Sequence, residues 1–330
     1  VFKVISDNNL SSIFRIFLSS LILIFFFYSL PIIINFTNSK ILLTNDYENN
    51  SKKVLAYTLN EKSKGSLDNN ETLNERDLLI DIFSLNNLET DTVRLNASTI
   101  KQLFEDTNYK LDDVRKKKLV KPVALTLLPE EIKMIENTKK RKELFIQIVL
   151  PLILKENNNI RLDRKRLFSI INKSKNTELE KKWLDRKYKQ YGVPSKDLSI
   201  LKIRIDEVPV SLALAQAAKE TGWGTSRFAQ EGNALFGQWT WKNNDGIKPK
   251  ENLNANFSVK NFNSLLDSVN SYILNINTHP AYKELRNFRM SQYNIGKNIT
   301  GSDMANFLQK YAEIGYEYVV KVKDMITKNK

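Results

Sequence analysis

The sequence has no cysteine and a single histidine, His279, among its 330 residues. The absence of cysteine excludes disulfide bonds and catalysis by a thiolate, and zinc sites built from cysteine or clustered histidine have no ligands here. We therefore expect neither a metal nor a cofactor. Because no serine or aspartate motif accompanies His279, we interpret it as a packed helix end, with a histidine base as the alternative.

Acidic residues are in the minority. The chain has 51 lysines and arginines against 37 aspartates and glutamates, which gives a formal net charge of +14. An excess of this size indicates an anionic partner: a nucleic acid, an anionic lipid or a polymer such as the cell wall. Charge alone does not choose among the three.

One long stretch carries no charge. Residues 16–34, IFLSSLILIFFFYSLPIII, are long enough to cross the hydrocarbon core of a bilayer, about 30 Å thick, as one helix. No small-residue cleavage site follows, so 13–36 is predicted to be an uncleaved signal anchor. Lys3 and Arg15 then place the stub 1–12 in the cytoplasm. The rest of the chain would face the periplasm or cell wall from the inner membrane, which excludes nucleic acid as the normal partner.

The remaining chain divides by composition. Residues 37–75 are rich in Asn, Ser, Lys and Glu and are predicted to be a flexible linker. Residues 76–130 have helical apolar spacing in pieces and are interpreted as an accessory segment without an assigned role. From 131 to 330, apolar residues recur mostly at helical spacing, which predicts a mainly helical domain.

The stretch 208–241, VPVSLALAQAAKETGWGTSRFAQEGNALFGQWTW, holds the candidate chemistry. Pro209 suits the start of a helix and Gly222 the position just past its end, so we predict a helix over about 209–221. Alanine and leucine on most of its faces indicate a helix that is buried on most sides. Glu220 falls in the last turn, where burial and the negative end of the helix dipole disfavour ionisation.

A carboxyl group that stays protonated near neutral pH is what a glycosidase uses to protonate a leaving oxygen. Glu220 is therefore the candidate general acid, and the alternative is a glutamate that hydrogen-bonds nearby loop amides. Aromatic rings and amides crowd together beyond it, a combination that grips sugar rings, although a small aromatic core under a loop is the alternative. With Gln216, which shares a helix face with Glu220, the candidate substrate-binding residues are Trp223, Asn233, Phe236, Gln238, Trp239 and Trp241.

The run AQAAKETGWGTSRFAQEGNALFGQWTW resembles the glucosaminidase domain of glycoside hydrolase family 73, in its Bax-type bacterial branch. Only Thr221, in place of serine, departs from the branch pattern in the first half of this run. The runs KRKELFIQIVLPLILKENNNI and NTHPAYKELRNFR also resemble the branch, so the resemblance covers about 131–330. It implies an α+β, mainly α fold: a lysozyme-like glucosaminidase domain with a small β lobe, here preceded by one transmembrane helix.

The run LQKYAEIGYEYV near the end of the sequence also resembles the family. By that resemblance Tyr311 points into the active site, and Glu313 and Tyr318 help to shape it. Ile314 stands where the family has arginine, so the contact that this arginine makes is not expected here. Asp245 and Gly246 form a turn signal, which predicts a hairpin in the β lobe.

The resemblance implies a hydrolase of the endo-β-N-acetylglucosaminidase type that cleaves the β-1,4 bond after N-acetylglucosamine in peptidoglycan glycan strands. Glycosidases usually need a second carboxylate. Glu251 is the glutamate of KENLNAN, whereas the acidic position of the family aligns nearer Asn254. Three readings stay open: Glu251 serves as the second catalytic group, the substrate's acetamido group attacks while Tyr311 stabilises charge, or catalysis is weakened.

The alternative function is a membrane-anchored peptidoglycan-binding scaffold with weak or no catalytic activity. Glu220 and its neighbouring glycines favour the enzyme, and the absent β-lobe acid favours the scaffold. The expected partners are peptidoglycan strands and, through the N-terminal helix, the membrane. No protein partner is indicated.

Overall fold

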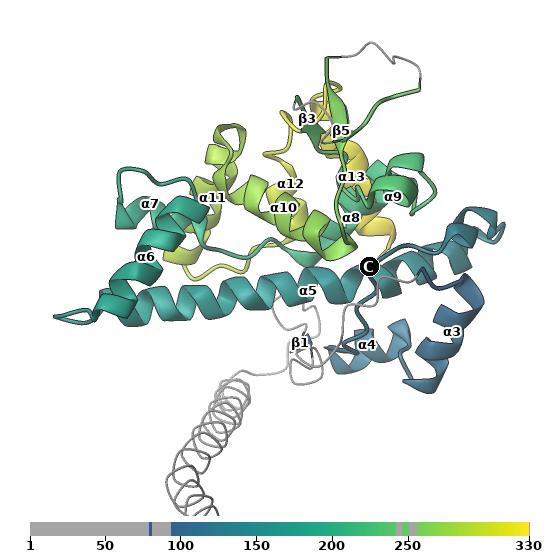
Figure 1. The fold of residues 1–330 in the computed structure, drawn as a ribbon, viewed down its shortest axis with the longest axis horizontal. Helices are drawn as coiled ribbons and strands as arrows, with labels where there is room; N and C mark the ends of the chain where they lie inside the picture. Colours follow the sequence, from purple (N-terminus) through teal and green to yellow (C-terminus); the bar gives the residue numbers. More distant parts are fainter. Residues whose placement is uncertain (1–78, 81–93, 242–245, 251–255, 330) are drawn as a thin grey trace, which may run out of the picture. The chain divides into compact units, whose positions relative to one another are not determined.

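The computed structural model describes residues 79–80, 94–241, 246–250 and 256–329. All of them lie in one compact unit, Thr72–Lys330. The described chain is mainly helical with a small antiparallel sheet, which confirms the predicted α+β, mainly α class (Figure 1). Its helices include none that is long and apolar enough to cross a bilayer. The predicted anchor at 13–36 and linker at 37–75 lie outside the described residues.

The first described part of the unit, 94–134, shares its apolar core with the helices that follow. It contains the elements α3 (Ala97–Asp106), α4 (Leu111–Lys117), β2 (Leu119–Val120) and the 3-10 helix η3 (Glu130–Met134). Strand β2 pairs in parallel with β1 (Leu79–Ile80). Phe104, Leu128 and Ile132 are buried in the same cluster as the helices downstream. Residues 94–134 are therefore built into the domain core.

Helix α5 (Thr138–Ile171) is the longest element, with 34 residues and a length of about 50 Å at 1.5 Å per residue. Asn137 caps its start by accepting a hydrogen bond from the backbone N–H of Lys140. Helix α6 (Glu178–Gln190) returns along the far end of α5. Asp163 pairs with Lys187, and Lys173, later in the chain, pairs with Glu180, earlier in α6. The pairs therefore run in opposite order along the two segments, so α6 runs antiparallel to the end of α5.

One short helix, α8 (Val210–Thr221), confirms the helix predicted over 209–221. Seven more helical elements follow α6 in the described part of the chain. They are α7 (Leu198–Arg204), α9 (Arg227–Gly232), α10 (Leu265–Thr278), η4 (Pro280–Tyr282), α11 (Lys283–Asn294), α12 (Gly301–Ala305) and α13 (Tyr316–Lys328). Helices α5, α12 and α13 contact α8 directly. At Gly301, an added Cβ would lie 2.7 Å from the backbone nitrogen of Leu212. Glycine thus lets α12 approach the backbone of α8 closely.

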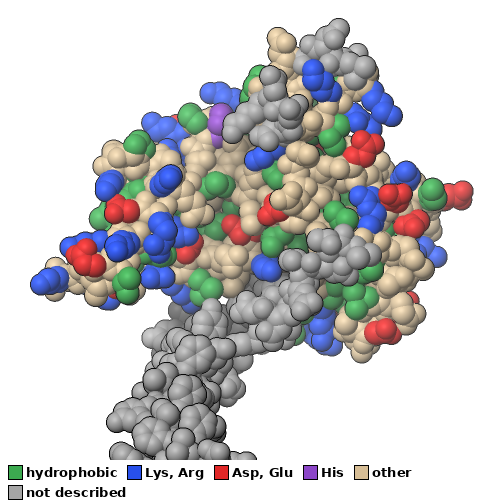
Figure 2. All heavy atoms as spheres, viewed as in Figure 1, with side chains coloured by type: hydrophobic (Ala, Val, Ile, Leu, Met, Phe, Trp, Pro, Cys, Tyr) green, Lys and Arg blue, Asp and Glu red, His purple; other side chains and the backbone are tan. Residues whose placement is uncertain are grey.

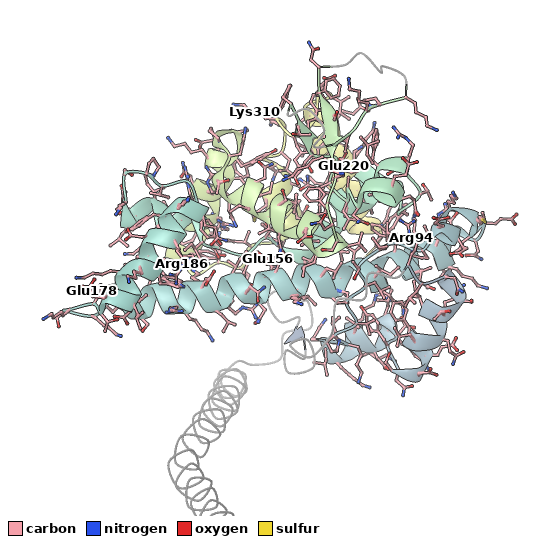
Figure 3. The ribbon with its side chains drawn as sticks, in the orientation of Figure 1. Arg94, Glu156, Glu178, Arg186, Glu220 and Lys310 are labelled. Carbon is pink, nitrogen blue, oxygen red and sulfur yellow. The ribbon has the colours of Figure 1, made fainter. Side chains whose placement is uncertain are left out.

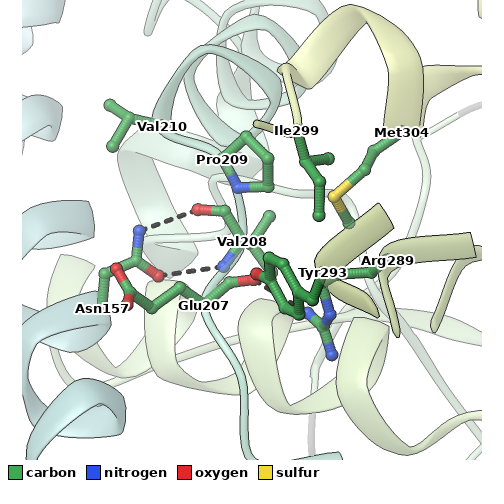
Figure 4. Close-up of a pocket in the computed structure, with 9 residues that line it drawn as sticks. All are labelled: Asn157, Glu207, Val208, Pro209, Val210, Arg289, Tyr293, Ile299 and Met304. Atoms are coloured by element: carbon green, nitrogen blue, oxygen red, sulfur yellow. Dashed lines mark hydrogen bonds between the residues drawn. The ribbon is translucent and has the colours of Figure 1, made fainter. Parts of the chain in front are cut away.

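Buried polar side chains hold the segment that leads into α8. The amide of Asn157, on α5, donates to the carbonyl of Val208 at 2.7 Å and accepts from its N–H at 3.1 Å (Figure 4). From α11, buried Arg289 donates to the carbonyl of Glu207 at 2.8 Å and pairs with the carboxylate of Asp206 at 3.4 Å. These contacts satisfy backbone groups that have no partner inside α8, and they fix where the helix starts.

The β lobe is a three-stranded sheet of β3 (Trp239–Thr240), β4 (Gly246–Ile247) and β5 (Ser258–Lys260). Both β3 and β4 pair with β5 in antiparallel fashion, in the order β3-β5-β4. The predicted hairpin turn at Asp245 and Gly246 is therefore wrong, since Gly246 lies within β4. A Cβ on Gly246 would lie 2.5 Å from the carbonyl oxygen of Val259, so this glycine marks a close approach of two strands.

Replacing Asn157 with alanine tests the clamp on the start of α8. Asn157 is 3% exposed, so Asn157→Ala leaves the N–H and carbonyl of Val208 buried without partners. We expect the free energy of unfolding to fall by about 1–3 kcal/mol, measured by urea unfolding followed through tryptophan fluorescence. The control is Asn159→Ala, two residues along the same helix on its exposed side, with an expected change of about 0.5 kcal/mol or less. Equal stability of the two variants would contradict the clamp.

Candidate active site

Glu220 lies in the last turn of α8, and Gly222 ends that helix in the left-handed conformation, with φ of 56°. Its carboxyl group is mostly buried, and burial raises its pKa above the ordinary value for glutamate. A hydrogen bond from Tyr318 and the charge of Lys219 act in the opposite direction, and burial outweighs both. Burial thus shifts the pKa of this carboxyl in the expected direction. Figure 3 shows Glu220 beneath the β lobe.

A chain of hydrogen bonds fixes one oxygen of Glu220. The hydroxyl of Tyr318 donates to Oε1 of Glu220 at 2.7 Å and accepts from the amide of Gln216 at 3.1 Å. The amide oxygen of Gln216 in turn accepts from the hydroxyl of Tyr272 at 2.6 Å. Gln216, Tyr272 and Tyr318 are at most 1% exposed. Gln216 therefore positions Tyr318, and through it Glu220, from a buried place, and its substrate-binding role stays a prediction.

Tyr311 lies on the same side of the site as Tyr318. Their rings stack at 5.1 Å between centroids, and the hydroxyl of Tyr311 donates to the carbonyl of Phe236 at 2.8 Å. Burial raises the pKa of Tyr311 well above 10, so its hydroxyl keeps its proton at neutral pH. Phe236 itself is buried and stacks on Tyr272, with 3.8 Å between ring centroids. The structure thus brings Tyr311 beside Glu220 and places Phe236 in the wall behind it.

Gly237 lies beside the second oxygen of Glu220 and places no side chain against it. It has φ of 59°, and a Cβ built on it would lie 3.4 Å from Oε2 of Glu220. Glycine adopts this conformation without strain, and any larger residue would project toward the carboxyl. A substrate oxygen can therefore approach Oε2 from the side of Gly237.

The exposed aromatic rings of the site belong to the β lobe. Trp239 and Trp241 are 47% and 71% exposed, and their ring centroids lie 6.4 Å apart. Phe257, which sequence reasoning missed, stacks on Trp239 at 4.4 Å. No local spacing indicated this contact, because it depends on the pairing of β5 with the strand that carries Trp239. Trp239 and Trp241 meet edge to face, with 71° between their planes, so the lobe exposes two indole rings of the kind on which sugar rings stack.

The two amide candidates have one partner each. Asn233 donates to the carbonyl of Phe262 at 2.9 Å, and Gln238 donates to the carbonyl of Ser271 at 3.4 Å. Their side-chain oxygens are buried and have no hydrogen-bond partner in the part of the chain that the structure describes. Asn233 also ends α9 in the left-handed conformation, with φ of 52°. These contacts give both amides a role in shaping the loop that carries Phe236.

Trp223 lies apart from these groups. Its ring meets that of Phe145 edge to face at 5.9 Å, and Nζ of Lys142 lies 4.9 Å from its centroid. It lines a hollow between the first turns of α5 and the ends of α8 and α13. The structure therefore places Trp223 under the loop that follows Glu220, which was the alternative interpretation for a single tryptophan.

The other sequence candidates lie at the margin of the described site. Glu313 is exposed, on the loop between Tyr311 and α13. Glu251 and Asn254 lie outside the described residues, so the second catalytic group stays a prediction. His279 ends α10, as expected, and its Nδ1 accepts from the N–H of Ala281. Its side chain is exposed rather than packed, because the helix end faces the surface.

Comparison with known proteins agrees with this geometry. Residues 201–330 match the family model described as mannosyl-glycoprotein endo-beta-N-acetylglucosaminidase, or glucosaminidase. Over 187 residues the chain is 32% identical to Protein bax of Escherichia coli (strain K12), and the match covers 54% of this chain. It spans 66% of the length of that relative. No solved structure matches the chain significantly. The chain is thus a member of the Bax-type proteins and carries their glucosaminidase domain.

Proposed function

We propose that this protein hydrolyses the β-1,4 bond after N-acetylglucosamine in peptidoglycan strands, with Glu220 as the general acid. The observation that carries the proposal is the setting of Glu220: a largely buried carboxyl with a raised pKa, one oxygen fixed by Tyr318 and the other open beside Gly237. A glucosaminidase domain is consistent with cleavage of a glycan. The β lobe opposite α8 supports a lysozyme-like arrangement, with the substrate between the two.

In the proposed reaction a sugar ring stacks on an exposed indole ring of Trp239 or Trp241, which directs the next glycosidic oxygen toward Glu220. Oε2 of Glu220 gives its proton to that oxygen as the bond breaks. Gln216 and Tyr318 keep the carboxyl in one orientation, so little reorganisation is needed in the transition state.

The second catalytic group is proposed to be Glu251 or the acetamido group of the substrate. Within the described part of the chain, the charged side chain that shifts the pKa of Glu220 is Lys219, and no second carboxylate does so. The hydroxyl of Tyr311 already donates its hydrogen bond to the carbonyl of Phe236. That hydrogen bond would have to break before Tyr311 could stabilise charge that develops on the substrate. This arrangement favours Glu251 or the acetamido group as the attacking partner, with Tyr311 in a supporting role.

The proposal keeps the predicted location, with an N-terminal anchor in the inner membrane and the domain facing the periplasm or cell wall. A tethered hydrolase of this kind would act on strands within reach of the membrane. The scaffold function is the second candidate, because the family's acidic position aligns with Asn254 in this sequence.

Replacing the acid tests the proposed reaction. The full chain in nonionic detergent should release fragments that end in N-acetylglucosamine from purified peptidoglycan, as read by mass spectrometry of the reducing ends. Glu220→Gln should lower this rate by about 10²–10⁴-fold, the contribution expected of a general acid. The control Glu136→Gln changes an exposed glutamate just before α5 and should leave the rate unchanged. If the unmodified chain releases no fragments yet pellets with peptidoglycan, the scaffold function replaces the enzyme.

The pH profile tests the hydrogen bond to Glu220. This bond favours the ionised carboxyl, so Tyr318→Phe should raise the pKa of Glu220 further. A general acid works only when protonated, so kcat/KM falls as pH rises through that pKa, and this fall should move to higher pH in Tyr318→Phe. Tyr316→Phe, on the same helix and 66% exposed, is the control and should leave the profile in place. A shift to lower pH, or no shift, would contradict the assigned role of Tyr318.

A further inference from the structure

The far end of the α5–α6 pair carries half of the chain's net charge. Residues 161–190 contain eleven lysines and arginines and four aspartates and glutamates, an excess of seven out of the net +14. Figure 2 shows lysine and arginine side chains gathered over this end of the molecule, which holds α6 and the last turns of α5. Such a local excess is larger than solubility requires and creates a strong positive potential.

The four carboxylates of this region are all engaged with lysines. The pairs are Lys187 with Asp163, Lys173 with Glu180, Lys181 with Glu178 at 2.8 Å, and Lys196 with Asp185 at 2.7 Å. Six further exposed cations have no carboxylate partner in the described part of the chain: Lys165, Arg166, Lys175, Lys182, Arg186 and Lys189. The uncompensated charge therefore points into solvent.

All of these cations except Lys175 lie on helices. Lys182, Arg186 and Lys189 are spaced by four and three residues, so they share one exposed face of α6. Beneath them Trp183 is 5% exposed and lies between α6 and α5, with the guanidinium of Arg166 at 5.0 Å from its ring. The positive surface is thus held in place by a packed core, which reduces the entropy lost when it binds a partner.

The surface is remote from the candidate active site. Phe145, which touches Trp223 just after Glu220, precedes Lys165 by twenty residues of α5, or about 30 Å along the helix. Figure 3 shows Arg186 and Glu220 toward opposite ends of the domain. A partner bound here leaves the carboxyl of Glu220 uncovered.

An extended anionic polymer fits this surface better than a bilayer does. A helix that lies on a bilayer presents a continuous apolar face. The exposed large apolar side chains here are single ones among the charges, namely Leu162, Phe168 and Leu179. Phe168 comes six positions after Leu162, whereas neighbours on one face of a helix are three or four positions apart, so the two side chains do not form one patch on α5. Lysines spread over two helices match a partner whose negative charges are also spread out.

We infer that the α5–α6 end is a second wall-binding surface, which holds the carboxylates of peptidoglycan stem peptides while the Glu220 end acts on a glycan strand. The identity of the polymer rests on the proposed function. Two contacts about 30 Å apart on one rigid domain raise the effective concentration of the enzyme at its substrate without enlarging the active site.

The test measures binding of the full chain, in nonionic detergent, to peptidoglycan sacculi by pelleting. Both variants carry Glu220→Gln, so that no digestion occurs. The first also has Lys165, Lys182, Arg186 and Lys189 changed to glutamine. The matched control has the exposed Lys101, Lys110, Lys116 and Lys121 of the α3–α4 region changed to glutamine, with the same loss of four charges. We expect the apparent affinity to fall about tenfold in the first variant and less than twofold in the control.

A chain that carries only Glu220→Gln should bind sacculi with amidated carboxyl groups as weakly as the first variant binds untreated sacculi. Equal binding by the two variants would overturn the inference, whatever the catalytic activity. So would a tenfold difference that appears only with vesicles of phosphatidylglycerol and phosphatidylcholine, because it would assign the surface to a bilayer. If the unmodified chain cleaves no glycan but the variants show the expected difference in binding, the inferred surface stands and the proposed reaction fails.

Discussion

The burial of helix α8 is the constraint on which the rest of the domain depends. A helix enclosed by α5, α12 and α13 must present small or apolar side chains, and its sequence of alanines and leucines does so. Each polar group on it must also find a partner inside the protein. Gln216 meets this requirement by bonding to Tyr272 and Tyr318, and the second of these tyrosines bonds to Glu220. The need to satisfy one buried amide therefore also orients the candidate acid.

The elements that local chemistry determines were predictable from the sequence. Pro209, Gly222 and the apolar residues between them defined α8 to within a residue, and the position of Glu220 in its last turn indicated a raised pKa. The mainly helical content followed from helical spacing, and the small β lobe from the resemblance to the family. Exposed Trp239 and Trp241 also lie together as the crowding of aromatic residues suggested.

Contacts between distant parts of the chain were not predictable in this way. Tyr318 is 98 residues from Glu220, so no spacing rule indicates that its hydroxyl meets the carboxyl. Trp223 and Gln216 stand near the acid in sequence, but sequence proximity did not indicate that Gln216 is buried or that Trp223 packs against Phe145. A glycine suits a tight turn, and it also suits a strand that passes close to another backbone. Only the pairing of β4 with β5 shows that Gly246 serves the second purpose.

The place of Tyr318 on α13 has a consequence for the order of assembly. The chain is synthesised from its N-terminus, so α5 and α8 are available to pack before α13 exists. Glu220 then has its helix and its neighbours but lacks the hydroxyl that orients it. The catalytic constellation is completed only when α13, the last helix described, folds back onto α8. A nascent chain that lacks α13 would thus carry Glu220 without the hydroxyl that orients it.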